Sequence, residues 1–167
     1  GPRVLDGQVA RGMCEEIEAG IMFCDVRGFT ALTQEVGAQI IPIMNEIFGV
    51  IGEEAEKRGG EILKFIGDAM LLIFPKETCS AADVAQAMVE TVRAARGRVA
   101  EVAASTERAV SVGFGCHLGE VIYGNIGTAR RIDFTVMGAA VNLASRLESL
   151  CQPIGASGVF SQAGQKH

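Results

Sequence analysis

The stretch GIMFCDVRGFT, residues 20–30, joins an apolar run to a tight polar exit. A short apolar run followed by turn residues is typical of a strand buried on both faces, so we expect a central strand here. Beyond Gly28, the sequence predicts a short helix that is capped by Thr30. The strand would then carry Asp25 to its very end, where the chain leaves the sheet.

A second stretch, EILKFIGDAMLLIF at residues 61–74, predicts a hairpin that turns at Gly67 and Asp68. If this hairpin lies beside the first strand, Asp68 and Asp25 meet at the same end of the sheet. Two carboxylates a few ångströms apart repel each other unless a cation lies between them. Because Mg²⁺ prefers carboxylate oxygens combined with phosphate and water oxygens, the pair predicts a divalent-cation site for a phosphate compound.

The polar exit after Asp25 has a matching interpretation. Backbone N–H groups at a glycine that precedes a helix form a cradle for an anion. The residues of this predicted cradle are Arg27, Gly28, Phe29 and Thr30.

The rest of the chain predicts alternating helices and strands. We expect the first helix to end at Gly37, a helix with an apolar face from Ile40 to Ala55, a helix over about 78–105, a strand pair that turns at Gly119, a short strand over 133–138 and a helix over about 139–150. This order predicts an α+β or α/β fold, with one sheet and helices packed against it.

Composition limits the class of protein. The 167 residues carry a formal net charge of −5, and the five cysteines form no C-x-x-C pair. A disulfide framework, a structural zinc site and a nucleic-acid partner are therefore not indicated. The charged first twenty residues exclude a signal peptide, and no apolar run approaches a membrane span. We expect a cytoplasmic domain without membrane contact.

Three more side chains have the chemistry of a nucleotide site. Asn142 and Arg146 lie four apart on a predicted helix, so they share one face, and an amide with a guanidinium suits a ribose and a phosphate. Lys64 precedes Asp68 by four residues. Its ammonium only donates hydrogen bonds, so it favours adenine, whose N1 accepts, over guanine, whose N1 carries a hydrogen.

Three motifs together resemble the catalytic domain of class III nucleotidyl cyclases, and the bacterial-type adenylyl cyclases in particular. They are FCDVRGFTALT at 23–33, GGEILKFIGDAMLLIF at 59–74 and DFTVMGAAVNLASRLE at 133–148, and the similarity extends from about 21 to 151. The resemblance implies a ferredoxin-like βαββαβ core. It also implies a head-to-tail homodimer in which both chains build each active site. We expect the domain to span residues 17–167 without the C-terminal strands of many members, after a linker or cloning segment at 1–16.

The resemblance also implies roles for the site residues. Asp25, the Val26 carbonyl and Asp68 would hold two Mg²⁺ or Mn²⁺ ions. From the partner chain, Lys64 and Thr135 would read the adenine of ATP. Asn142 would orient the ribose, and Arg146 would stabilise the α-phosphate. The implied products are 3′,5′-cyclic AMP and pyrophosphate.

Several alternatives stay open at this point. A guanylyl cyclase keeps the chemistry, but family guanylyl cyclases typically carry Glu in place of Lys64. A catalytically silent cyclase-like dimerisation domain is the second alternative, and a diguanylate cyclase is disfavoured because the hairpin lacks the G-G-D/E-E-F turn. A threonine at the position of Thr135 is typical of a subgroup that includes bicarbonate-responsive members. The resemblance therefore raises bicarbonate responsiveness as one open expectation. Any upstream regulatory module lies outside this sequence.

Three departures from the family pattern concern substrate affinity. Ala139 replaces a common polar residue, and Ser111 or Gly113 stands where several members have Arg. The lysine that many members supply to the terminal phosphates from a C-terminal strand has no counterpart here.

Overall fold

The sheet is built around β1, Cys14–Val26, which contains the predicted central strand. The computed structural model describes residues 14–77, 79–150 and 158–162. Within them β1 lies between β3, Ala69–Pro75, and β4, Val112–Gly127, and is antiparallel to both. The sheet order is β2-β3-β1-β4-β5, where β2 is Glu61–Ile66 and β5 is Ile132–Met137. The predicted α+β class with a βαββαβ core is confirmed.

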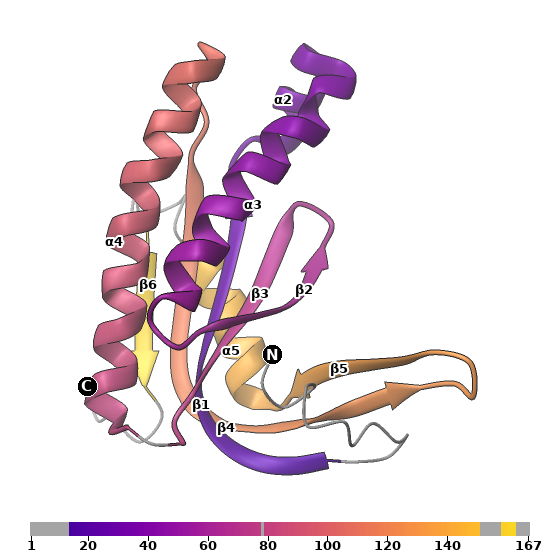
Figure 1. Cartoon of the computed structure of the whole chain (residues 1–167), viewed down its shortest axis with the longest axis vertical. Helices are drawn as coiled ribbons and strands as arrows, with labels where there is room; N and C mark the ends of the chain where they lie inside the picture. The colour runs from indigo at the N-terminus through magenta and orange to yellow at the C-terminus, as the bar shows by residue number, and fades with distance from the viewer. Residues whose placement is uncertain (1–13, 78, 151–157, 163–167) are drawn as a thin grey trace.

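Two long helices cover one face of the sheet and a shorter helix covers the other (Figure 1). The first face carries α3, Ile40–Glu56, and α4, Ala81–Thr106, over the larger hydrophobic core. The second face carries α5, Ala139–Ser149, over a smaller core that includes Ile21, Leu71 and Tyr123. None of the helices in the described ranges is long and apolar enough to cross a membrane.

A buried carboxylate ties α3 to α4. Glu54 is only 5% exposed and accepts hydrogen bonds from Lys57, Arg58 and Arg98 at 2.9, 3.1 and 2.8 Å. These three cations lower the pKa of Glu54 to about 2. A buried charge is tolerated when it is paired and hydrogen-bonded in this way, so Glu54 stays ionised between the helices.

The first short helix begins differently from the prediction. Helix α2, Phe29–Val36, is preceded by Gly28 with φ of +66°, and no side chain caps it. Thr30 therefore lies inside the first turn and is not the cap. Glycine adopts this left-handed conformation without steric cost, which is why the chain can turn so sharply after β1. The predicted end at Gly37 is confirmed, and a 3₁₀ turn, Gly37–Gln39, leads into α3.

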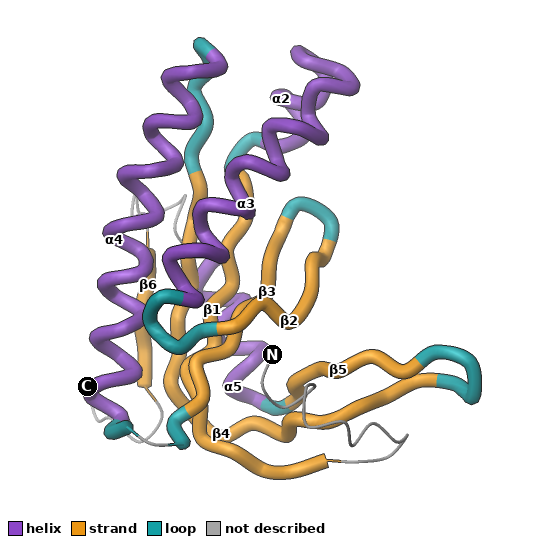
Figure 2. Tube along the Cα trace, in the orientation of Figure 1, coloured by secondary structure: helices purple, strands orange, loops and turns teal. Residues whose placement is uncertain are grey.

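The predicted strand pair around Gly119 is wrong. β4 runs through Gly119 as one strand of 16 residues, in register with Ala19 of β1. On the side of β4 away from β1, two strands pair with it in turn. Residues 114–118 pair with β6, Gly158–Gln162, which the sequence analysis does not predict, and residues 122–127 pair with β5. Gly119 serves close packing: a Cβ there would lie 3.1 Å from the Cβ of Ala140 on α5. Beyond this point β4 and β5 form a long hairpin that projects from the body (Figure 2).

Candidate active site

The two aspartates that the sequence pairs do meet. Asp25 is in register with Ala69, the residue after Asp68, and the Val26 amide donates to the Asp68 carbonyl at 3.2 Å. Both aspartates are half-buried and line one cavity of about 480 Å³ at the end of the sheet. We call this the carboxylate cavity. Its other lining residues are Val26, Arg27, Gly28, Phe29, Thr30, Ala31, Glu148 and Ser149.

The predicted anion cradle forms one wall of the carboxylate cavity. The Arg27 amide is already used, because it donates to the Ser111 carbonyl at 2.9 Å. The amides of the first turn of α2 have no acceptor within their own helix. The amides of this turn and the Arg27 guanidinium therefore supply the positive potential that a phosphate needs.

The donor atoms of the carboxylate cavity fit a hard divalent cation. Two carboxylates and a backbone carbonyl at Val26 are oxygen ligands of the kind that Mg²⁺ and Mn²⁺ take. In the described part of the chain, no group of three or more His, Cys, Asp or Glu side chains is placed to hold a metal by itself. The remaining ligands would have to come from phosphate and water, which is the usual situation for Mg²⁺ in phosphoryl chemistry.

Sequence reasoning missed one residue of this cavity, Glu148. Glu148 lines the carboxylate cavity together with Asp25, Arg27 and Asp68. Burial, followed by the hydrogen bond and the charge of Asp25, raises the pKa of Glu148 to about 8. A sequence signal did exist, since an acidic residue in the last turn of a helix opposes the helix dipole.

The thiol beside Asp25 is chemically quiet. Cys24 is fully buried, and burial, together with the charges of Asp25 and Glu148, raises the pKa of its thiol. Since the thiolate is the reactive form of cysteine, Cys24 serves as a small core residue.

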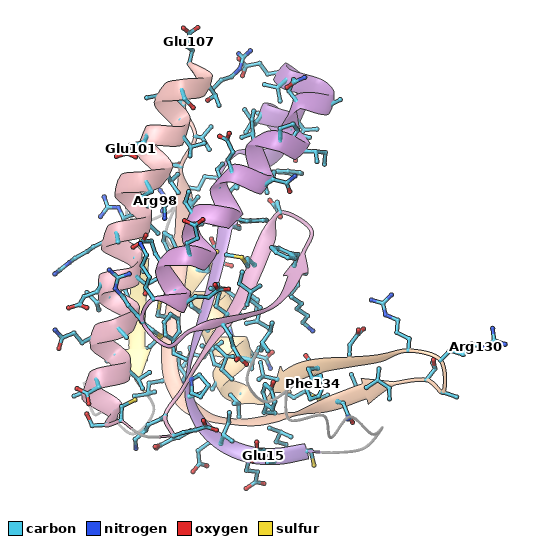
Figure 3. All side chains as sticks on the ribbon, in the orientation of Figure 1. Glu15, Arg98, Glu101, Glu107, Arg130 and Phe134 are labelled. Atoms are coloured by element: carbon cyan, nitrogen blue, oxygen red, sulfur yellow. The ribbon has the colours of Figure 1, made fainter. Side chains whose placement is uncertain are left out.

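The predicted base-reading pair is also brought together. The Lys64 ammonium donates to the Thr135 hydroxyl at 2.9 Å, across 71 residues of sequence, and Thr135 is only 7% exposed. This pair lines a second cavity of about 910 Å³ between β2 and β5, which we call the lysine cavity. Its wall includes Phe134, whose ring lies on the β4–β5 hairpin (Figure 3).

The carboxylate cavity and the lysine cavity have no lining residue in common. Asn142 and Arg146 are exposed on α5 and line neither of them. One chain therefore presents two separate sets of polar groups, plus an exposed amide–guanidinium pair.

Comparison with known proteins identifies the family. The profile described as the adenylate and guanylate cyclase catalytic domain matches residues 13–155. The chain belongs to this family. The predicted resemblance to class III nucleotidyl cyclases is thereby confirmed.

Both kinds of cyclase occur among the relatives of this cyclase domain. An adenylate cyclase of Anabaena cylindrica is 31% identical over 160 residues, covering 89% of this chain and 32% of the relative. The adenylyl cyclase CyaB of P. aeruginosa superposes with a TM-score of 0.76 at 30% identity, covering 82% of this chain and 74% of the solved chain. The guanylyl cyclase Cya2 superposes with a TM-score of 0.69, also at 30% identity, covering 84% and 72%.

The cyclase domain spans only part of its curated relatives, about a third or less of the length of the first ones matched. Family membership supports a nucleotide cyclase, a phosphorus–oxygen lyase. It does not by itself choose between ATP and GTP, since solved cyclases of both kinds are similar to this chain.

Proposed function

We propose that this domain is an adenylyl cyclase that converts ATP to 3′,5′-cyclic AMP and pyrophosphate at sites shared by two chains. The observation that carries the proposal is the separation of the carboxylate cavity from the lysine cavity within one chain. A nucleotide has its phosphates at one end and its base at the other. A head-to-tail pair of chains would let the phosphates meet Asp25 and Asp68 of one chain while the base meets Lys64 and Thr135 of the other.

The preference for ATP follows from Lys64. An ammonium group has three donors and no acceptor, so it complements adenine N1 and opposes the N1–H of guanine. Because Thr135 accepts one of the three donors, the ammonium is held in place with two donors left for a base.

The remaining roles follow from charge and reach. Bound at Asp25, Asp68 and the Val26 carbonyl, two divalent cations would activate the ribose 3′-hydroxyl and neutralise the polyphosphate. Arg146 of the partner is assigned to the α-phosphate and Asn142 to the ribose, where the amide holds the sugar for in-line attack. The ribose 3′-oxygen forms a bond to the α-phosphorus, and the bond between the α-phosphorus and the oxygen that bridges it to the β-phosphate breaks. The proton of the 3′-hydroxyl leaves to solvent, and pyrophosphate departs.

One experiment tests this function directly. The purified domain is incubated with Mn²⁺ and either ATP or GTP, and the products are identified by mass spectrometry. Cyclic AMP is the expected product, and it should be absent for Asp25→Ala. Cyclic GMP as the only product would establish the second candidate, a guanylyl cyclase, which the similarity to Cya2 favours. If neither cyclic AMP nor cyclic GMP forms, the result would support a silent dimerisation domain instead.

A further inference from the structure

An apolar cavity between α3 and the β2–β3 hairpin has no task in the proposed reaction. Its volume is about 600 Å³, and we call it the apolar groove. Its apolar wall includes Phe29, Ile41, Met44, Phe48, Ile62 and Phe65. Ile41 and Phe65 are 62% and 59% exposed, far more than the side chains of the core. A contiguous exposed apolar surface is typical of a binding site.

The projecting β4–β5 hairpin carries a second exposed apolar surface. Ile126 is 54% exposed, and Ile122 and Met137 are also exposed. Ile122 is in register with Met137, and Ile126 lies four residues farther along the same strand, so all three lie on one side of the hairpin. The exposed tip carries Arg130 and Arg131, and Arg130 points away from the body (Figure 3). The hairpin is therefore apolar along one side and basic at its end.

The apolar groove has the complementary order along α3. Ile41 lies at the start of the helix, the Phe48 ring stacks on Phe65 near its middle, and Glu53 and Glu56 line the groove at its end. A helix rises about 1.5 Å per residue and a strand about 3.4 Å, so residues 41–56 and residues 122–127 both extend over roughly 20 Å. The groove and the hairpin thus match in length, in apolar character and in charge.

The proposed pairing of two chains brings these surfaces together. The apolar groove shares Phe29 with the carboxylate cavity. The hairpin supplies Ile126 and Met137 to the lysine cavity. When the carboxylate cavity of one chain faces the lysine cavity of its partner, the hairpin of the partner therefore lies next to the groove.

We propose that the β4–β5 hairpin of each chain docks along the apolar groove of a second copy, with its basic tip at the acidic end of α3. The inference rests on the proposed function, since it assumes that the carboxylate cavity of one chain faces the lysine cavity of the other. It adds the surface that holds the two chains together, which lies outside both cavities for most of its length. By symmetry, each dimer contains this contact twice.

The first test measures the dissociation constant of the dimer by sedimentation velocity, without nucleotide. Ile126→Asp on the hairpin and Ile41→Asp in the groove are each expected to raise this constant at least about 10-fold, because each symmetric dimer then buries two unpaired carboxylates. Phe160→Asp is the matched control. Phe160 is exposed on β6, which lies far from the hairpin (Figure 1), so this variant should dimerise like the wild type.

The second test exchanges charges between the two surfaces. Arg130→Glu places Glu opposite Glu56 in its homodimer, and Glu56→Arg places Arg opposite Arg130, so each variant should dimerise about 10-fold more weakly than the wild type at low salt. A heterodimer of the two variants has opposite charges at both contacts and should regain the affinity of the wild type. Glu101→Arg, a charge reversal on the exposed side of α4 (Figure 3), should leave the dissociation constant unchanged.

The outcomes separate this inference from the function on which it rests. Wild-type dissociation constants for Ile126→Asp and Ile41→Asp overturn the docking, and the mixing of active-site variants still tests the shared sites independently. A mixture of Arg130→Glu and Glu56→Arg that associates no more tightly than either variant alone also overturns it, because the basic tip then does not face the acidic end of α3. A wild-type domain that stays monomeric at every concentration removes the premise, and the shared-site function with it.

Discussion

At the residue scale, the proposed base selection depends on the hydrogen bond between Lys64 and Thr135. Thr135 lies on β5 and Lys64 lies on β2, which are at opposite ends of the strand order of the sheet. The sheet curves so that the Lys64 Nζ and the Thr135 Oγ1 are 2.9 Å apart. A lysine side chain has many rotamers, and a fixed hydrogen-bond acceptor reduces that freedom before a nucleotide arrives. Thr135, which itself lines the lysine cavity, thus also restrains Lys64 there.

Replacing Lys64 tests the base assignment. Lys64→Glu is expected to reduce kcat/KM for ATP by about 1–3 kcal/mol, the value of a good base-edge contact, and to move preference toward GTP. Lys64→Met, which removes the donors without adding an acceptor, should lose ATP activity without that gain. Steady-state kinetics with both nucleotides provide the measurement. Unchanged kinetics in both variants would show that Lys64 does not contact the base.

At the element scale, the contact between α5 and β4 fixes the position of the polar side chains that α5 carries. α5 carries Asn142 and Arg146 on an exposed side and directs Glu148 into the carboxylate cavity. Its position depends on Gly115, where the helix backbone rests directly on the strand. A single glycine in the sheet thus sets the geometry of two groups of polar residues.

Adding one methyl group at this contact should be costly. Gly115→Ala is expected to destabilise the domain by about 1–3 kcal/mol or more, because the new Cβ would overlap backbone atoms that have no freedom to rotate away. Urea unfolding measures the change. The matched control is Gly97→Ala in α4, where a Cβ meets nothing within 4 Å. That change should stabilise the domain by about 0.5–1 kcal/mol through helix propensity. Equal stability of Gly115→Ala and the wild type would mean that α5 is free to shift on β4.

At the scale of the whole molecule, the carboxylate cavity and the lysine cavity are separate, and under the proposed function each is one half of a shared site. In the proposed head-to-tail dimer, α5 of each chain contributes to both sites, with Glu148 in its own carboxylate cavity and Arg146 at that of the partner. A symmetric pair of this kind contains two equivalent sites. Activity should then fall faster than protein concentration on dilution.

Mixing two inactive variants tests the shared sites. Asp25→Ala and Arg146→Ala are each expected to be inactive alone, because every site of either homodimer carries a lesion. In a heterodimer, one site collects both lesions and the other collects none, so about half of the wild-type activity should return per heterodimer. Native mass spectrometry counts the heterodimers, and a cyclic AMP assay measures the rescue. Heterodimers without activity would assign the metal and phosphate groups to the same chain.

Local sequence determined most of the elements. The apolar run before Asp25, the hairpin turn at Gly67 and Asp68, and the helical periodicity after Ile40 each depend on neighbours a few residues apart, and each prediction is confirmed. The two errors came from residues with more than one use. Glycine is common in turns, but Gly119 allows a helix to pack closely on the strand. Threonine is common at helix N-caps, but here Gly28 precedes the helix and makes the turn.

The sequence by itself placed Asp25 at a strand end and Asp68 in a hairpin turn, so the two would meet if the hairpin lay beside that strand; the pairing of β1 with β3 in the structure supplies that condition. Only the tertiary structure decided that Glu148 enters their cavity, that Thr135 holds Lys64, and that the carboxylate and lysine cavities are separate. Those arrangements depend on the curvature of the sheet and on the backbone contact of α5 with Gly115. Both arise from packing between segments far apart in the chain, which local patterns do not encode.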